Sequence, residues 1–315
     1  MKRFAFYLCC LFAVSCTCGN ESVYQQHLIR IDEALERADE YVNMKQQKIS
    51  TIENMLNSRG VTPLQQYHIY RQLFIEYQPF QFDKAKETLE RQLVIARQIA
   101  SDSLQHCTML DMAMLHTTAG FYLEADEIFA QIDTASLTLD QKVYWYDARQ
   151  KFLHDYQEYV TTSSIEVPDA SQITRYQDRI LEITSDDMPL NRHIRILRII
   201  ESGDFEKAYE ENRAFIASLD KTSRDYAVQT YWQGYICENL DRTEELIKWW
   251  TESALCDIQG AIKDNASLCS IAIKLTDPQD TDRAFKYISI SLDDALFYNA
   301  KLRKVQIAST LPWIL

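Results

Sequence analysis

A four-residue motif that ends in alanine, or once in leucine, recurs along this chain. Its five copies are FDKA (Phe82–Ala85), YLEA (Tyr122–Ala125), FEKA (Phe205–Ala208), TEEL (Thr243–Leu246) and TDRA (Thr281–Ala284). Successive copies are 40, 83, 38 and 38 residues apart, so the long interval corresponds to two repeats with one degenerate copy between them. A period near 40 residues is typical of stacked helix-turn-helix units.

The residues around the motif fit the two helices of such a unit. Gly120 and Gly203 shortly precede two of the copies, where a glycine would end the first helix in a left-handed conformation. The motif alanine would let the partner helix approach closely. In the second helix, apolar positions recur every three or four residues, as at Ala85, Leu89, Leu93, Ala96 and Ile99.

The repeats from Thr62 to Ala300 resemble tetratricopeptide repeats. They lack the family's closing proline, and their spacing exceeds its standard 34 residues. Six glycines and six prolines in 315 residues leave few sites for the tight turns of β folds. The sequence therefore predicts an all-α protein, a tetratricopeptide-like helical-repeat solenoid (α–α superhelix) preceded by a long N-terminal helix.

That long helix is predicted over residues 17–60. Its apolar positions alternate three and four apart, a heptad spacing that one lysine interrupts, and run through Leu28, Ile31, Leu35, Ala38, Val42, Lys45, Ile49, Ile52 and Leu56. The pattern fits two interpretations. One is a coiled-coil seam between two copies, which would make a homodimer, and the other is packing along the chain's own solenoid.

The repeats divide at the polar run VTTSSIEVPDAS, in which Pro168 interrupts helical periodicity. We expect N-terminal helical repeats over 61–160, a loop over 161–170 and C-terminal helical repeats over 171–300. The two groups of repeats would form halves of one solenoid.

The N-terminal residues are typical of a targeting signal. Lys2 and Arg3 precede a twelve-residue uncharged apolar segment, the pattern of a secretory signal over residues 1–16. The small residues before Cys16 fit the bacterial lipoprotein pattern, so lipidation of Cys16 is one expectation, ordinary cleavage nearby is the second and an uncleaved anchor is the third. Each would place the folded chain outside the cytoplasm, on the periplasmic side of a bacterial envelope, and lipid would anchor it to the membrane.

The C-terminus, 301–315, becomes apolar at LPWIL (Leu311–Leu315). Tryptophan is enriched at membrane interfaces, so this end fits the start of a membrane segment. The alternative is an apolar end packed on the last repeat.

Four of the eight cysteines lie in the predicted folded part, beyond the signal and the Cys16–Cys18 stretch at its end. Cys256 and Cys269 flank a predicted helical turn symmetrically, so they would pair if the two helices face each other in an oxidising compartment. The alternative is that all four are buried free thiols: Cys107, Cys237, Cys256 and Cys269.

No catalytic, cofactor-binding or metal-ligating motif is recognisable, which indicates a protein that is not an enzyme. The formal charge of −13, or −15 without Lys2 and Arg3, excludes direct nucleic-acid binding by this segment. Stacked repeats create a concave surface, and Tyr144, Tyr231 and Trp232 are candidates for a groove on it. The alternative is that these aromatic residues pack between helices.

Three stretches, Arg30–Leu56, Gln72–Ile99 and Tyr287–Ile314, resemble a family of bacterial envelope regulators. The resemblance implies an exported tetratricopeptide-like sensor region, followed by one membrane helix and a cytoplasmic domain of unknown function that this chain would lack. It favours a sensor that binds a protein or peptide partner. A lipid-anchored scaffold for envelope assembly or nutrient capture is the alternative.

Overall fold

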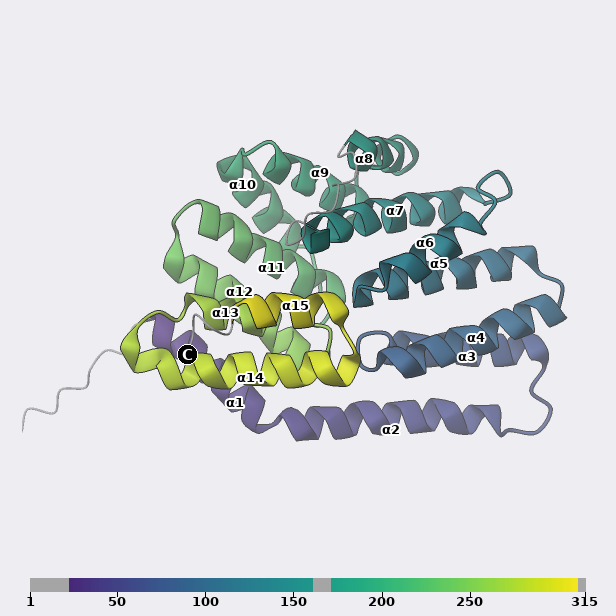
Figure 1. The fold of residues 1–315 in the computed structure, drawn as a ribbon, viewed down its shortest axis with the longest axis horizontal. Coiled ribbons are helices and arrows are strands. Elements are labelled where there is room, and N and C mark those ends of the chain that lie inside the picture. The colour runs from purple at the N-terminus through teal and green to yellow at the C-terminus, as the bar shows by residue number, and fades with distance from the viewer. Residues whose placement is uncertain (1–22, 161–170, 311–315) are drawn as a thin grey trace, which may run out of the picture.

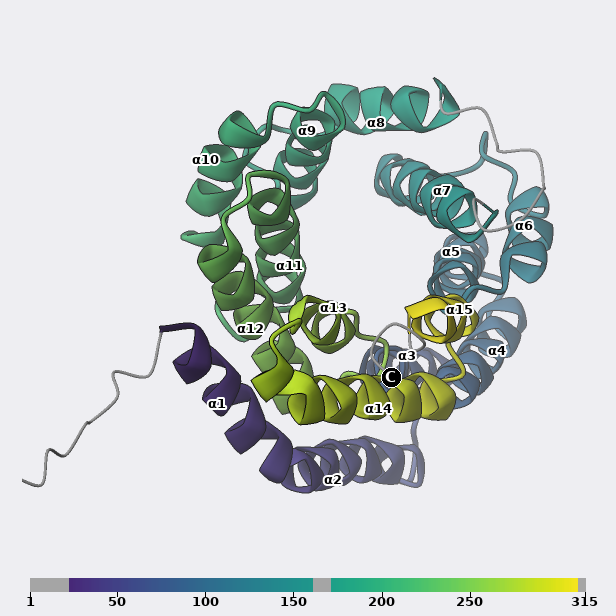
Figure 2. The same ribbon diagram turned by 60° about the vertical axis from the view of Figure 1, so that its left-hand side comes forward.

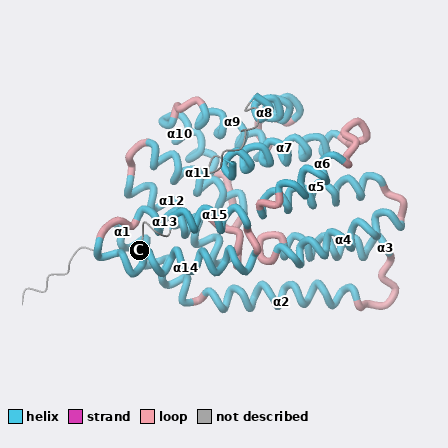
Figure 3. The backbone as a smooth tube through the Cα atoms, in the orientation of Figure 1, coloured by secondary structure: helices cyan, strands magenta, loops and turns pink. Residues whose placement is uncertain are grey.

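The computed structural model describes residues 23–160 and 171–310, and regular structure in these ranges is entirely helical (Figures 1 and 3). The helices are α1 (Val23–Glu36), α2 (Ala38–Leu56), α3 (Pro63–Tyr77), α4 (Phe82–Gln98), α5 (Asp102–Ala119), α6 (Tyr122–Ala130), α7 (Leu139–Val160), α8 (Ser171–Ile183), α9 (Pro189–Glu201), α10 (Phe205–Ile216), α11 (Arg224–Asn239), α12 (Thr243–Gln259), α13 (Ser267–Lys274), the 3-10 helix η1 (Pro278–Asp280), α14 (Thr281–Tyr298) and α15 (Lys301–Thr310). The all-α prediction is confirmed.

The sequence motif marks one helix of each pair. All five copies are the first four residues of a helix, at the starts of α4, α6, α10, α12 and α14. Their fourth side chains are at most 3 % exposed, because each faces a neighbouring helix. Gly120 ends α5 with φ 80°, and Gly203 follows α9 with φ 79°, as predicted for the end of the first helix.

The helix pairs stack into a superhelix that closes into a ring (Figure 2). Helices α5, α7, α9, α11 and α13 lie toward its inside, and α15 also lies there, next to α5. The largest hydrophobic core runs between the helix layers, from α1 and α2 through α14 to α15.

Contacts between the two ends of the superhelix close the ring. The amide N of Lys263 donates to the carbonyl O of Pro79 at 2.7 Å, and Tyr298 Oη donates to the carbonyl O of Gln78 at 2.8 Å. Tyr287 Oη of α14 likewise donates to the carbonyl O of Leu28 at 3.1 Å. Helices α1 and α14, from opposite ends of the chain, therefore lie side by side at a seam.

The predicted long N-terminal helix is wrong in one respect. It is two helices, because Arg37 leaves helical geometry at φ −101° and ψ 7°. The heptad positions nevertheless face one way: Leu28, Ile31, Ile49 and Ile52 are buried in the chain's own core. This confirms the intramolecular interpretation, and the homodimer seam is wrong because the solenoid already occupies that surface.

The predicted disulfide is not formed. Cys107, Cys237, Cys256 and Cys269 are free thiols. Cys256 Sγ contacts the carbonyl O of Lys221 at 3.1 Å, before α11, whereas Cys269 is buried in the core through α13. The two cysteines therefore face different neighbours.

Parts of the sequence-based predictions fall outside the described residues. These parts are the signal region with Cys16, the loop 161–170 and the apolar end 311–315. Within the described ranges, no helix combines the length and apolarity needed to cross a bilayer. The start of the predicted apolar end is α15, whose Ile307 is fully buried.

Candidate binding surface on the inside of the ring

Charged side chains from three elements gather on the inside of the ring. We call this surface the inner face and define it by Lys151, Asp155 and Glu158 of α7, Asp264 of the α12–α13 loop and Arg303 of α15. The α7 residues lie three or four positions apart and so share one side of that helix. The charges of Lys151 on α7 and Arg303 on α15 both act on Asp264 of the loop, which places the three elements around a common space.

Direct contacts organise this surface. Lys151 Nζ donates to Asp155 Oδ2 at 2.7 Å, and His154 Nδ1 lies 3.6 Å from Asp155 Oδ1. Gln306 Nε2 of α15 donates to Glu158 Oε1 at 2.5 Å. The side chain of Lys151 is 37 % exposed and that of His154 is 51 % exposed, so water reaches the surface.

The protonation states follow from burial and charge pairing. Burial opposes the charged form of Lys151, but the charge and hydrogen bond of Asp155 outweigh it and raise the pKa of Lys151. Burial likewise opposes ionisation of Asp155, yet Lys151 and His154 hold its pKa below the usual range. Burial raises the pKa of Asp264, an effect that the charge of Arg303 partly offsets. The inner face thus carries both signs of charge.

The predicted groove residues divide between this surface and the packing. Tyr144 lies on the same side of α7 as Lys151, Asp155 and Glu158. Its hydroxyl donates to Asp111 Oδ1 at 3.0 Å, which fixes the ring against α5. Tyr231 stacks on Trp250 at 5.9 Å and lies within reach of the charge of Arg303. Trp232 packs edge to face against Tyr231. All three are half-buried, so they support the surface more than they line an open groove.

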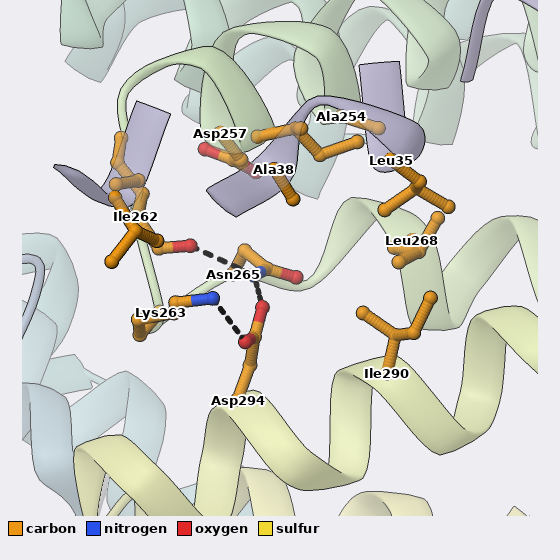
Figure 4. A pocket seen from close by; sticks show the side chains of 13 residues that line it. Leu35, Ala38, Ala254, Asp257, Ile262, Lys263, Asn265, Leu268, Ile290 and Asp294 are labelled. Atoms are coloured by element: carbon orange, nitrogen blue, oxygen red, sulfur yellow. Dashed lines mark hydrogen bonds and ion pairs between the residues drawn. The ribbon is translucent and has the colours of Figure 1, made fainter. Parts of the chain in front are cut away.

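A small cavity lies at the ring seam, between α1, α2, α12 and α14 (Figure 4). Its volume of about 40 Å³ has room for only a few water molecules. Lys263 Nζ and Asn265 Nδ2 donate to Asp294 at 2.6 and 3.3 Å across its lower edge. Asp257 also lines it, and burial raises the pKa of this carboxyl to about 7.

Within the described residues, no group of three His, Cys, Asp or Glu side chains is placed to hold a metal ion. The inner face itself was missed by reasoning from the sequence alone. Its one visible signal is the spacing of Asp147, Lys151, Asp155 and Glu158 along a helix. A charged stripe on the inside of a ring looks the same in sequence as one on the outside, because both are solvated.

Stacked helix pairs with a buried alanine at the motif position in four copies, and a leucine in the fifth, define a tetratricopeptide-type repeat protein. The model of the SusR N-terminal TPR domain matches residues 35–309. The chain therefore belongs to the family of SusR N-terminal TPR domains. A search of curated proteins gave no significant match.

Proposed function

We propose that this chain is the exported sensor region of a membrane-bound regulator, and that its inner face binds a protein or peptide partner without catalysing a reaction. Tetratricopeptide-type repeats generally mediate protein interactions, and their concave side is the usual binding surface. The observation that carries the proposal is the convergence of charges from α7, the α12–α13 loop and α15 on one surface, which water reaches at Lys151.

The position of α15 suggests how binding would be transmitted. Arg303 and Gln306 extend from α15 to the inner face, and Gln306 bonds Glu158 directly. Lys301 Nζ lies 3.8 Å from the centre of the Phe121 ring, which holds the start of α15 against the α5–α6 turn. A partner that competes for Glu158 would shift α15, and a following membrane helix would carry that shift inward.

The experiment is complementation of a gene deletion in the native bacterium, with transcripts measured by RNA sequencing. The complementing genes encode the full-length protein as wild type, as Lys151→Ala/Arg303→Ala, or as the control Arg179→Ala, which removes an exposed i,i+3 ion pair on α8. We expect the inner-face variant to reproduce the deletion and the control to restore wild-type transcripts.

Identical transcripts in the deletion strain and in all three complemented strains would overturn the sensor proposal. Intact mass spectrometry of the membrane-extracted protein would then test the scaffold alternative, for which acyl mass on Cys16 is the expected result.

A further inference from the structure

A second, larger hollow lies where the two ends of the superhelix meet. Its volume is about 340 Å³, within the range of small-molecule sites. Lys45 and Lys48 of α2 and Glu76 near the end of α3 line one side. Arg224 at the start of α11 and Cys256 of α12 line the other side. Residues far apart in the sequence therefore share its walls.

The lining of this hollow is positively charged, although the whole chain carries a formal charge of −13. Lys45 Nζ and Lys48 Nζ both contact Glu76, at 3.0 and 2.5 Å, so two ammonium groups share one carboxylate. Arg224 is exposed and lines the same hollow. It faces Asp257 and Asp264 at longer range, and lowers the pKa of both carboxyls against the larger effect of burial.

The start of α11 adds to the positive electrostatic potential of the hollow. Ser223 and Thr222 line the hollow with Arg224, so the N-terminal end of a 16-residue helix opens into it. Ser223 Oγ accepts from the amide N of Tyr226 at 3.1 Å, which fixes this helix end. The partial positive charge of a helix N-terminus favours anions.

We propose that this hollow binds a small organic anion that carries a carboxylate or a phosphate group. Lys48 of α2 and Arg224 of α11 supply exposed cations, and Lys45 and Lys48 share the single carboxylate of Glu76. The anion would link α2 and α3 to α11 and α12, and so brace the ring at its seam. This inference does not depend on the function proposed for the inner face.

The test is isothermal titration calorimetry of the full chain at pH 7 and low salt, with citrate and inorganic phosphate as separate probes. The variants are Lys48→Met, Arg224→Gln and Glu76→Gln, and Lys207→Met on α10 is a control that removes one exposed positive charge elsewhere. The side chain of Lys48 is 64 % exposed, so its removal leaves the packing intact.

We expect one anion per chain, at least fivefold weaker binding in Lys48→Met and Arg224→Gln, tighter binding in Glu76→Gln and no change in Lys207→Met. Binding of citrate alone identifies a carboxylate ligand, and binding of phosphate alone identifies a phosphate ester. Failure of both probes to bind the wild type would overturn the proposal. An equal loss in Glu76→Gln and Lys48→Met would also overturn it, because charge would then not control binding.

Discussion

Asp32 and Arg283 are 251 residues apart in the sequence, and their side chains form an ion pair of 2.9 Å. Arg283 also donates to Asp280 Oδ1 at 2.8 Å, so one guanidinium neutralises two carboxylates, one from each end of the chain. Asp280 is 2 % exposed, and Asp32 and Arg283 are each about one quarter exposed. This cluster holds α1 against α14.

We predict that Arg283→Met lowers the free energy of unfolding by about 2–3 kcal/mol, because it removes the guanidinium that Asp32 and Asp280 share and leaves Asp32 with only the more exposed Lys286, at 3.2 Å. This loss is smaller than for a fully buried ion pair, because the side chains of Asp32 and Arg283 are partly exposed. Urea unfolding at pH 7 measures it. The matched control is Arg179→Met, whose ion pair with Glu182 is exposed, and for which we expect a loss below about 0.5 kcal/mol. Equal effects in the two variants would contradict the prediction.

Gly120→Ala tests the attachment of α15. A Cβ at this position would lie 2.8 Å from the amide N of Leu302, and φ is 80°. We expect a loss of more than about 2 kcal/mol, from strain and from displacement of α15. Gly203→Ala is the control, because φ is 79° there and a Cβ meets nothing within 4 Å. It should cost about 1 kcal/mol. Hydrogen exchange of residues 301–310 should rise only in Gly120→Ala.

Gly234→Ala tests the close approach of α11 and α12. A Cβ on Gly234 would lie 2.3 Å from Cδ1 of Trp250, a buried side chain whose indole N–H donates to the carbonyl O of Tyr231. We predict a loss of about 2–3 kcal/mol from overpacking. Trp250→Leu should relieve it, so the double variant should lose at least about 1 kcal/mol less than the two single variants together. Additive losses would show that the clash is not the cause.

Asp257 should make stability depend on pH. Its folded-state pKa of about 7 lies above the value of the unfolded chain, so folding favours the protonated form. The contribution to stability is fully present below about pH 4 and is lost as the pH rises to 7. We therefore expect Asp257→Asn to match the wild type at pH 4 and to exceed its stability by up to about 4 kcal/mol at pH 8. Urea unfolding at both pH values measures this difference, and a constant difference would contradict the assigned pKa.

The repeat register was predictable because it depends on local packing. Ala85, Ala125 and Ala208 are fully buried at the starts of their helices, and each makes contacts close by in the sequence. Gly120 and Gly203 were predictable for the same reason, since helix termination is a local property.

The break at Arg37 and the closed ring were not predictable from these patterns. The heptad pattern passes through Arg37 without interruption, whereas the turn there accompanies the packing of α1 on α12 and α14, which are distant in the sequence. Ring closure depends on small rotations that accumulate over all repeats, so no single residue carries its signal. The inner face exists only because the ring closes. Its charged residues are visible in the sequence, but the sequence does not show that they lie on one surface.

The seam between α1 and α14 also fixes the order in which this molecule can fold. An open solenoid can nucleate at any repeat and grow from there. Here α1 completes its contacts with Arg283 and Tyr287 only after a segment about 250 residues later has taken shape. Contacts so distant in sequence form slowly. We therefore expect a fast phase that builds the interior repeats and a slow phase in which α1 docks on α14.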